Sequence, residues 1–471
     1  MPHFGSTAHL RALAAAALRT APAPTTAAAP TERVTIVSAS IGAGHDGAAA
    51  ELARRLTADG LAVDRIDLLD LLPARIGPLV RDGYHRMLVH APWAYQRIYR
   101  SSERAGGGGP LARTLLRTAE HRVLRALPPG TGAVVSTYPG ASRVLGNLRR
   151  AGRLAVPALT YLTDFSVHPL WVTGGIDIHL AAHAVPAAQA RAAGAPDVRV
   201  CGPVTNPRFR PADSRERSAA RIRFGLPQNA PLALLVAGSW GVGPVRQVAL
   251  ELRDCGAAVP VVVCGRNTAL AARLRADGIE HALGWVDDMP GLMQAADVLV
   301  QNAGGLTSLE AFAAGLPVAS YRCIAGHGLT NAAALEEAGL AVWIRRCADL
   351  KETVGDLITG PRGLLQREAG LALFTAAACG PAAEISRACR AGGRPAVPPA
   401  PTRRTRPAVR RLAATTAVAC AIWAGAFGTA VATTGEAPRL VRALGHELDP
   451  DDAPRTHANH PEGHHQEDRR P

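Results

Sequence analysis

Three glycine-containing segments of this chain bring backbone N–H groups together with side chains that can do chemistry. They are a histidine-bearing loop over residues 41–47, a glycine-rich loop over residues 238–243, and Asn-Ala-Gly-Gly-Leu-Thr-Ser-Leu-Glu over residues 302–310. Glycine lets the backbone approach an anion closely, and the start of a helix favours negative charge. In the third segment Thr307 offers a hydroxyl donor, and Glu310 offers a carboxylate for two ribose hydroxyls. We therefore predict that this segment binds a nucleoside diphosphate.

The first loop allows more than one interpretation. His45 stands where a strand gives way to a helix, and an imidazole there can take a proton from an acceptor hydroxyl. Alternatively, His45 only caps the helix or bonds a loop carbonyl. Gly42, Gly44 and Gly47 also satisfy the dinucleotide fingerprint, and Asp64 lies near the distance expected for a ribose contact. An NAD-type oxidoreductase is therefore the alternative function.

The second loop is a candidate for the diphosphate. Gly238, Ser239 and Gly241 follow a predicted strand and precede a helix, so backbone N–H groups face any anion bound there. A tight turn without a ligand is the alternative. The three glycines of this loop surround Trp240, which is more than a turn needs.

Alternating strand and helix patterns place these segments in two Rossmann-like domains of an α/β protein. Apolar runs bounded by Gly or Pro predict strands at 34–38, 62–68, 133–136, 158–162, 178–181 and 198–201, and again at 232–237, 259–264, 281–285, 298–301 and 317–321. Strands that alternate with helices form parallel, helix-covered sheets. We predict an N-terminal domain over residues 32–208 and a C-terminal domain over residues 212–388.

Composition limits the partners. The net charge of +14 favours nucleic acid or an anionic membrane surface. Zinc knuckles, aromatic stacking strips and basic recognition helices are missing from the sequence, so no nucleic-acid partner is expected. The eight cysteines form no Cys-x-x-Cys pair, and several lie in apolar runs, which indicates reduced thiols in a cytosolic body.

The two ends of the chain differ in composition from the domains. Residues 1–31 are predicted to be a disordered leader, residues 391–411 a basic Pro/Arg-rich linker, and residues 435–471 a disordered His-rich tail. The uncharged run 412–434 is long enough to span a bilayer, with a surface-lying helix as the alternative. Arginines on its N-terminal side predict a cytoplasmic membrane protein whose catalytic domains stay on the cytoplasmic side.

No metal and no cofactor is expected. The one Asp-x-Asp sequence lies at residues 449–451, in the tail. Histidines of the last segment are loosely spaced and predict adventitious metal binding only: His446, His457, His460, His464 and His465. Helix N-termini and arginines can neutralise a leaving diphosphate without a metal.

Several motifs, in order along the chain, resemble one enzyme family. Residues 302–310, with the Trp-Val-Asp-Asp-Met-Pro sequence at 285–290, look like the donor site of GT-B glycosyltransferases that use UDP-sugars. Residues 38–50 resemble the Gly-Gly-Gly-His loop of monogalactosyldiacylglycerol synthases, 163–171 resemble their Asp...His-Pro-x-Trp segment, and 202–209 resemble their hinge entry. The likeness covers about residues 33–385 and extends, more distantly, to the lipid II-forming UDP-GlcNAc transferase.

The resemblance implies glycolipid biosynthesis in a cleft between the two domains. A hexosyl group would pass, with inversion, from a UDP-sugar to a membrane lipid acceptor such as diacylglycerol, with His45 as the catalytic base or as a group that aligns the acceptor. The residues implied at the acceptor are Gly44, Asp164, His168 and Trp171. Those implied at the donor are Gly238, Ser239, Gly241, Val286, Asn302, Gly304, Gly305, Thr307, Glu310, His327 and Asn331.

One segment departs from the family pattern. Where the family has two amide or acidic side chains that touch the sugar hydroxyls, this sequence has His327 and Gly328, followed by Asn331. The transferred sugar is therefore open. A membrane-tethered protein that binds UDP-sugars with altered or lost catalysis is a further alternative.

Overall fold

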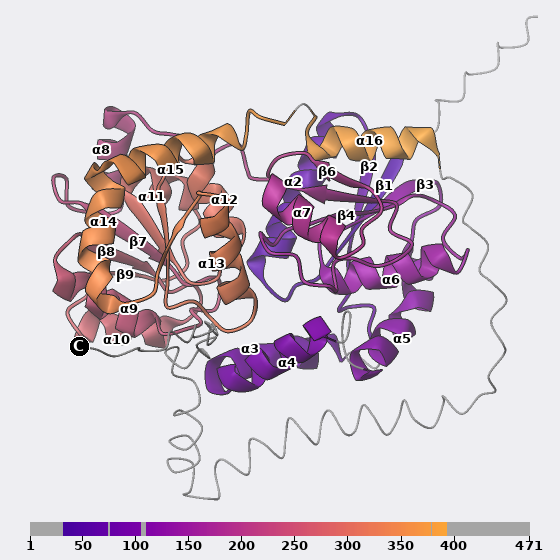
Figure 1. Ribbon diagram of the computed structural model, residues 1–471, viewed down its shortest axis with the longest axis horizontal. Coiled ribbons are helices and arrows are strands. Elements are labelled where there is room, and N and C mark those ends of the chain that lie inside the picture. The colour runs from indigo at the N-terminus through magenta and orange to yellow at the C-terminus, as the bar shows by residue number, and fades with distance from the viewer. Residues whose placement is uncertain (1–31, 74–75, 105–109, 378, 393–471) are drawn as a thin grey trace, which may run out of the picture. The chain divides into compact units, whose positions relative to one another are not determined.

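The computed structural model describes residues 32–73, 76–104, 110–377 and 379–392 (Figure 1). The predicted leader, the run 412–434, the His-rich tail and nearly all of the basic linker lie outside these residues. Among the described helices, none is long and apolar enough to cross a membrane.

The N-terminal half contains a six-stranded parallel sheet in the order β2-β1-β3-β4-β5-β6. The strands are β1 (Arg33–Ser38), β2 (Ala62–Asp67), β3 (Thr131–Ser136), β4 (Ala158–Tyr161), β5 (Ile178–Ala181) and β6 (Val198–Val200). The helices are α2 (Ala43–Ala58), α3 (Gly77–His90), α4 (Pro92–Arg104), α5 (Pro110–Ala126), α6 (Pro139–Arg150) and α7 (Ala184–Ala192).

The C-terminal half contains a second six-stranded parallel sheet, in the order β12-β11-β10-β7-β8-β9. Its strands are β7 (Leu232–Val236), β8 (Val259–Val263), β9 (His281–Leu283), β10 (Val298–Gln301), β11 (Val318–Tyr321) and β12 (Val342–Ile344). Its helices are α8 (Ser214–Arg223), α9 (Val245–Cys255), α10 (Thr268–Ala276), α11 (Met289–Ala295), α12 (Leu306–Ala313), α13 (His327–Glu337), α14 (Leu350–Thr359) and α15 (Pro361–Ala372). Two Rossmann-like domains were predicted, and two such sheets are present.

Small aliphatic side chains build the cores, as the low aromatic content requires. In the strands, residues such as Val34, Ile36, Leu234 and Val300 are fully buried or nearly so. Strands covered by helices on both faces lose their alternation of apolar and polar residues, which explains why they appear in the sequence as continuous apolar runs. Trp171 is the largest fully buried side chain of the described residues.

The last described helix, α16 (Pro381–Ala391), packs on the N-terminal half (Figure 1). Ile385 belongs to the same apolar cluster as Val34 and Leu52. The carboxylate of the neighbouring Glu384 accepts a hydrogen bond of 2.5 Å from the Arg199 guanidinium. The chain thus crosses from the first half to the second before α8 and returns after α15.

Both sheets reverse their strand order at one point, and the glycine-containing segments follow the strands at these points. The order reverses between β1 and β3 in the first sheet and between β7 and β10 in the second. Residues 41–47 follow β1, residues 238–243 follow β7, and residues 302–310 follow β10. Ligands of open α/β sheets bind at such switch points, beyond the carboxyl ends of the strands.

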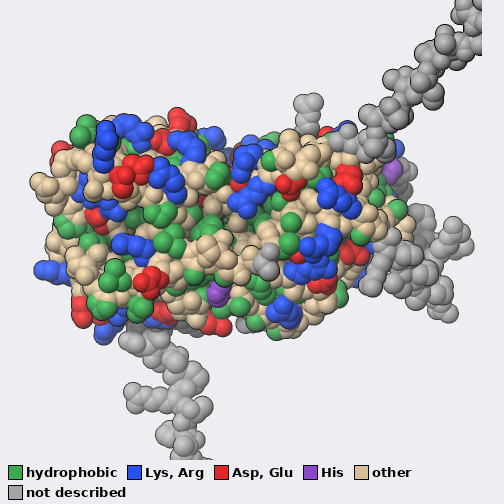
Figure 2. Space-filling model, turned by 90° about the horizontal axis from the view of Figure 1, so that it is seen from above, with side chains coloured by type: hydrophobic (Ala, Val, Ile, Leu, Met, Phe, Trp, Pro, Cys, Tyr) green, Lys and Arg blue, Asp and Glu red, His purple; other side chains and the backbone are tan. Residues whose placement is uncertain are grey.

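Charge on the described surface is mixed. The face in Figure 2 carries basic and acidic side chains beside one another. Ion pairs such as Arg246 with Asp277, at 2.6 Å, and Arg210 with Glu216, at 2.5 Å, follow the same pattern. The described residues therefore neutralise much of their arginine charge locally.

Candidate active site

The backbone fixes the proton on the ring of His45. This residue is in the first turn of α2, and its Nδ1 lies 2.9 Å from the carbonyl oxygen of Thr137 and 2.9 Å from the hydroxyl oxygen of Thr163. A carbonyl oxygen can only accept, so Nδ1 carries the hydrogen and Nε2 keeps its lone pair. The alternative that His45 bonds a loop carbonyl is correct for Nδ1, and this bond leaves Nε2 able to act as a base.

The aromatic rings of Tyr138 and Trp171 flank His45. The Tyr138 ring meets the imidazole edge-on at 5.3 Å between centroids, and the Trp171 ring lies at 6.1 Å. Together with the two threonine contacts, these rings hold the imidazole in one orientation. A catalytic base needs such a fixed position relative to the hydroxyl it deprotonates.

Leu306, the first residue of α12, packs against the glycines of α2. A Cβ atom on Gly47 would lie 2.5 Å from Leu306 Cδ2, and one on Gly44 would lie 3.6 Å from Leu306 Cβ. Gly44 and Gly47 are therefore explained by contact between the two halves. This contact, together with the ion pair of 2.6 Å between Asp64 and Arg33, argues against a dinucleotide bound by the first loop.

Asp164 is positioned by a buried indole. The Nε1–H of Trp171 donates a hydrogen bond of 3.0 Å to Asp164 Oδ2. Trp171 is fully buried, so it acts through Asp164 and does not meet the acceptor as predicted. Asp164 is half-buried, and no described residue forms a hydrogen bond with its Oδ1.

His168 also differs from the prediction. Its Nδ1 accepts from the backbone N–H of Leu170 at 3.1 Å, and its Nε2 lies 2.9 Å from the hydroxyl of Ser102 on α4. Burial lowers the pKa of His168, which favours the neutral ring. With both nitrogens engaged inside the protein, His168 anchors α4 and is not placed to touch an acceptor.

The loop after β4 crosses to the C-terminal half. Phe165 is buried in the core of that half, and the backbone N–H of Ser166 donates a 2.7 Å hydrogen bond to Asn331 Oδ1. Asn331 Nδ2 in turn donates to the carbonyl of Ala303 at 2.9 Å. Asn331 is fully buried, so it ties the loops of the two halves together instead of contacting the donor as predicted.

The segment after β10 is shaped by the side chain of Gln301. Its Oε1 accepts 2.7 Å from the N–H of Ala303 and also accepts from the N–H of Gly304, while Nε2 donates 2.6 Å to Ser320 Oγ. Gly304 has φ of +70°, and a Cβ there would lie 2.7 Å from Asn331 Cβ. Gly304 therefore forms the turn and does not offer its N–H to a phosphate.

Three further residues of this segment were predicted to contact the donor, namely Asn302, Gly305 and Thr307. Asn302 Nδ2 donates 2.9 Å to the carbonyl of Val242, so this side chain joins the loops after β7 and β10. Gly305 caps α12, and Thr307 is half-buried in its first turn. The start of a helix favours an anion, and Gly305 and Thr307 stand at this one.

Glu310 has an acidic side chain that burial keeps protonated to high pH. It is half-buried in α12, and burial raises its pKa to about 8. None of the described residues forms a hydrogen bond or ion pair with its carboxyl group. A buried polar group without a partner is costly, and the hydroxyls of a ligand would supply partners.

The loop after β7 contains glycines in the left-handed conformation. Gly238 and Gly241 have φ of +66° and +61°, and a Cβ on Gly241 would lie 2.9 Å from the carbonyl oxygen of Cys264. The carbonyl of Ser239 accepts from the N–H of Arg266 at 3.0 Å. Trp240 is half-buried and meets the ring of His85, on α3, at 4.7 Å between centroids.

Val286 and its neighbour Trp285 follow β9, the edge strand of the C-terminal sheet. Val286 is half-buried against the core, whereas Trp285 is 51% exposed. The Arg266 guanidinium lies 4.8 Å from the centre of the Trp285 ring.

His327 enters the same site from the first residue of α13. Its Nδ1 lies 3.1 Å from the hydroxyl of Tyr95, on α4. Burial lowers the pKa of His327, and the charges of Asp164 and His45 act on it in opposite directions. The contacts of His45 with Thr163, of Ser166 with Thr330 and of Tyr95 with His327 bring the segments of His45, Asp164 and His327 to one region.

The contribution of α4 was missed at the sequence level. Tyr95, Gln96 and Tyr99 all contact residues 326–330: Tyr95 bonds His327, Gln96 Oε1 accepts from the N–H of Gly326, and Tyr99 Oη lies 3.3 Å from Thr330 Oγ1. Burial, with a smaller contribution from Asp164, raises the pKa of Tyr99 to about 12. An amide and two tyrosines on one helix were the available signal.

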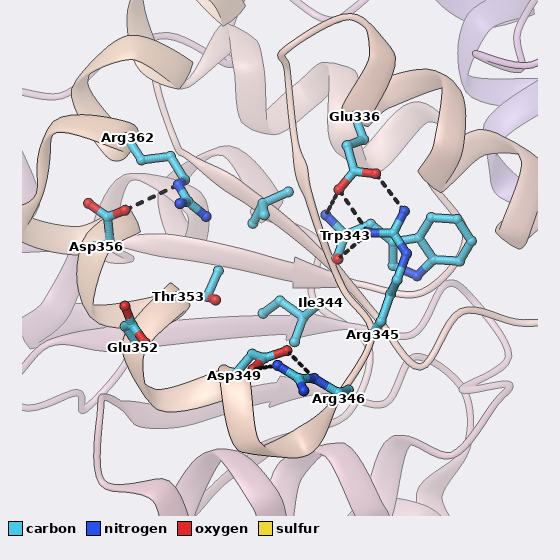
Figure 3. A pocket seen from close by; sticks show the side chains of 11 residues that line it. Glu336, Trp343, Ile344, Arg345, Arg346, Asp349, Glu352, Thr353, Asp356 and Arg362 are labelled. Atoms are coloured by element: carbon cyan, nitrogen blue, oxygen red, sulfur yellow. Dashed lines mark hydrogen bonds and ion pairs between the residues drawn. The ribbon is translucent and has the colours of Figure 1, made fainter. Parts of the chain in front are cut away.

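A hollow of about 450 Å³ lies elsewhere, beside β12 and α14 (Figure 3). Its arginines are paired with acids, for example Arg346 with Asp349 at 2.7 Å, and none of the three glycine-containing segments lines it. It is therefore separate from the site of His45. Within the described residues, no three His, Cys, Asp or Glu side chains are grouped to hold a metal ion.

Two family models match parts of this chain. Residues 45–204 match the sequence model of monogalactosyldiacylglycerol (MGDG) synthase. The chain resembles the MGDG synthases. This match starts at His45 and includes Asp164, and a second match, to group 1 glycosyl transferases, covers residues 244–359 and includes residues 302–310. The predicted resemblance is confirmed.

Among its relatives are processive diacylglycerol beta-glucosyltransferases from Bacillus pumilus (strain SAFR-032) and Bacillus subtilis (strain 168), 31% and 30% identical over 233 residues. Each match covers 48% of this chain and 60% of the relative, so the chain spans about three fifths of the length of the relatives it matches. Solved structures with similarity include Acinetobacter baumannii MurG (16% identity, TM-score 0.45) and Anabaena HepE with UDP-glucose (14%, 0.46). Each covers 76% of this chain and 98% of its own.

Proposed function

We propose that this chain transfers a hexosyl group from a UDP-sugar to a diacylglycerol-like lipid, with inversion at the anomeric carbon. The observation that carries the proposal is the ring of His45, whose Nδ1 contacts the Thr137 carbonyl and the Thr163 hydroxyl, next to Asp164, while its Nε2 has no hydrogen-bond partner among the described residues. The similarity to the MGDG synthases and to the diacylglycerol glucosyltransferases supports the same substrates.

The proposed step involves one proton and two bonds to the anomeric carbon. The acceptor hydroxyl oxygen attacks this carbon while the bond from it to the β-phosphate oxygen of UDP breaks. His45 Nε2 takes the hydroxyl proton, and UDP leaves with the electron pair of the broken bond. Attack opposite to the leaving group inverts the configuration.

The donor would lie over the carboxyl ends of β7 and β10. The start of α12, with Gly305 and Thr307, faces the diphosphate, and the left-handed turn at Gly238 lets the opposite loop approach it. The Glu310 carboxyl forms hydrogen bonds with the ribose hydroxyls, and the backbone of Val286 clamps the uracil. Helix N-termini stabilise the charge of the departing UDP without a metal.

Membrane association at the cytoplasmic face is part of the proposal. Leu79, Val89, Trp93 and Ile98, on α3 and α4, are each 45% or more exposed. Exposed arginines such as Arg97 share these helices. Apolar side chains with arginines around them suit an anionic lipid surface, and α4 also reaches the site through Tyr95.

The test is transfer to lipid. Purified chain is incubated with vesicles of anionic phospholipid and dioleoylglycerol and with radiolabelled UDP-glucose, UDP-galactose or UDP-N-acetylglucosamine in turn. A labelled glycolipid is expected with at least one donor, with a β-linkage by NMR. His45→Ala is the control and should give no product above background.

Two results would contradict the proposal. An α-linked product would exclude inversion. Tight binding of UDP without turnover of any donor would favour a UDP-sugar binding protein instead.

A further inference from the structure

One contact links the acceptor half to the segment that differs from the family pattern. The hydroxyl of Tyr95 lies 3.1 Å from Nδ1 of His327, and the two rings meet edge-on at 6.1 Å between centroids. Among the described residues, His327 Nε2 has no hydrogen-bond partner. The histidine is thus held by one nitrogen and offers the other.

The backbone before His327 is fitted to the same helix. Gly326 has φ of +70°, and a Cβ there would lie 2.6 Å from Cε1 of the Tyr95 ring. The N–H of Gly326 donates to Gln96 Oε1, one residue further along α4. Both the ring and the backbone of residues 326–327 are therefore placed by α4.

Tyr95 keeps its proton throughout the working pH range. Burial is the main cause of the raised pKa of Tyr95, and the neighbouring Tyr84 and Asp164 raise it further. A neutral phenol can donate or accept one hydrogen bond with Nδ1, and in either case it fixes which tautomer His327 adopts.

We propose that Tyr95 is a positioning residue which fixes His327 Nε2 against a hydroxyl of the transferred sugar and thereby sets the preference between donor sugars. This rests on the proposed function, since it assumes that a UDP-sugar occupies the site. Glucose and galactose differ only in the direction of one hydroxyl. A site that bonds a substrate hydroxyl discriminates against a sugar that leaves the protein group unpaired.

Tyr95→Phe tests this directly, because it keeps the ring against Gly326 and removes only the hydroxyl. We measure the dissociation constants of UDP-glucose, UDP-galactose and UDP by calorimetry, and the KM and kcat of transfer. The preferred donor should bind about three- to tenfold more weakly to the variant, as expected for one lost hydrogen bond. The affinity for UDP, which has no sugar, should stay within twofold.

Tyr99→Phe is the matched control. Tyr99 is one turn further along α4 and its hydroxyl meets Thr330, not His327. This variant should keep the wild-type ratio of dissociation constants between the two donors. In His327→Ala the dissociation constants of the two donors should become equal. Adding Tyr95→Phe to this variant should change neither constant further.

The outcomes separate this inference from the proposed function. Discrimination between donors that falls in Tyr95→Phe but not in Tyr99→Phe supports it, even if no lipid is glycosylated. An unchanged ratio in Tyr95→Phe overturns it while leaving transfer intact. Equal loss of affinity for UDP and UDP-sugars also overturns it, because α4 would then support the loops in general. A wild-type chain that binds both donors equally, or binds neither, refutes it as well.

Discussion

The side chain of Leu306 occupies the space that a methyl group on Gly47 would need. The distance from an added Cβ to Leu306 Cδ2 is 2.5 Å. Gly47 belongs to α2 in the N-terminal half, and Leu306 is the first residue of α12 in the C-terminal half. The glycines that resemble a dinucleotide fingerprint therefore serve the contact between α2 and α12. This contact sets the distance from His45 to the start of α12.

Gly47→Ala should slow transfer without destabilising the fold. Alanine in the helix interior is favoured over glycine by about 1 kcal/mol. The new methyl group displaces Leu306, so we expect about a three- to tenfold loss in kcat from misplacement of the donor loop. Gly42→Ala, where the Cβ would meet nothing within 4 Å, is the control. If the double variant Gly47→Ala, Leu306→Ala recovers the wild-type kcat, displacement of Leu306 is the cause. If the fold-losses in kcat of the two single variants multiply in the double variant, this explanation is wrong.

The imidazole of His45 should account for the proton transfer. His45→Ala should lower kcat by about 10²- to 10⁴-fold. Thr163→Val removes the second contact to Nδ1 but leaves the Thr137 carbonyl, so its effect should stay within about fivefold. Initial rates at saturating donor measure both. A rate for Thr163→Val as low as that of His45→Ala would show that the hydroxyl, not the carbonyl, orients the ring.

Glu310 should make the ligand-free chain less stable as the pH rises. Its carboxyl keeps its proton up to pH of about 8 in the folded state, whereas its ordinary pKa is 4.5. Between these values the folded state binds more protons than the unfolded state, so stability falls from pH 5 to pH 8. Glu310→Gln cannot ionise and should lack this component. Urea unfolding at several pH values gives the difference between the two curves, and parallel curves would refute the assignment.

Trp93 should contribute to membrane binding. It is 45% exposed on α4. Replacement by glutamate should weaken sedimentation with anionic vesicles about tenfold, because an apolar contact is lost and a repelled charge is gained. Ile222→Glu, a change at a 70% exposed side chain of α8, is the control and should bind as the wild type does. Equal effects of the two changes would mean that α3 and α4 are not the docking surface.

The sequence predicted the parts of the site that depend on local order. Strands appear as apolar runs because both faces are buried, and the segments at 41–47 and 302–310 follow β1 and β10 as expected. The first was predicted as a loop, but α2 already begins at Ala43. His45 was identified from its place after a strand. The strand β12 (Val342–Ile344) was not predicted.

Contacts between distant residues were beyond prediction from one sequence. Tyr95 and His327 are 232 positions apart, and nothing in α4 indicates which segment it will meet. Trp171, His168 and Asn331 were predicted to touch ligands, yet burial shows that each bonds another part of the protein. A sequence motif contains residues that support a site as well as residues that contact the ligand. Only the packing in the structure distinguishes these two kinds of residue.

The return of α16 to the first half has a consequence for synthesis of the chain. Ile385 and its neighbours pack into the core around Val34 and Leu52, so this core lacks these packing partners until the second half has been made. Domains usually fold in the order in which they leave the ribosome. Here the C-terminal half can finish first, and the half that carries His45 becomes complete only after α16 has emerged.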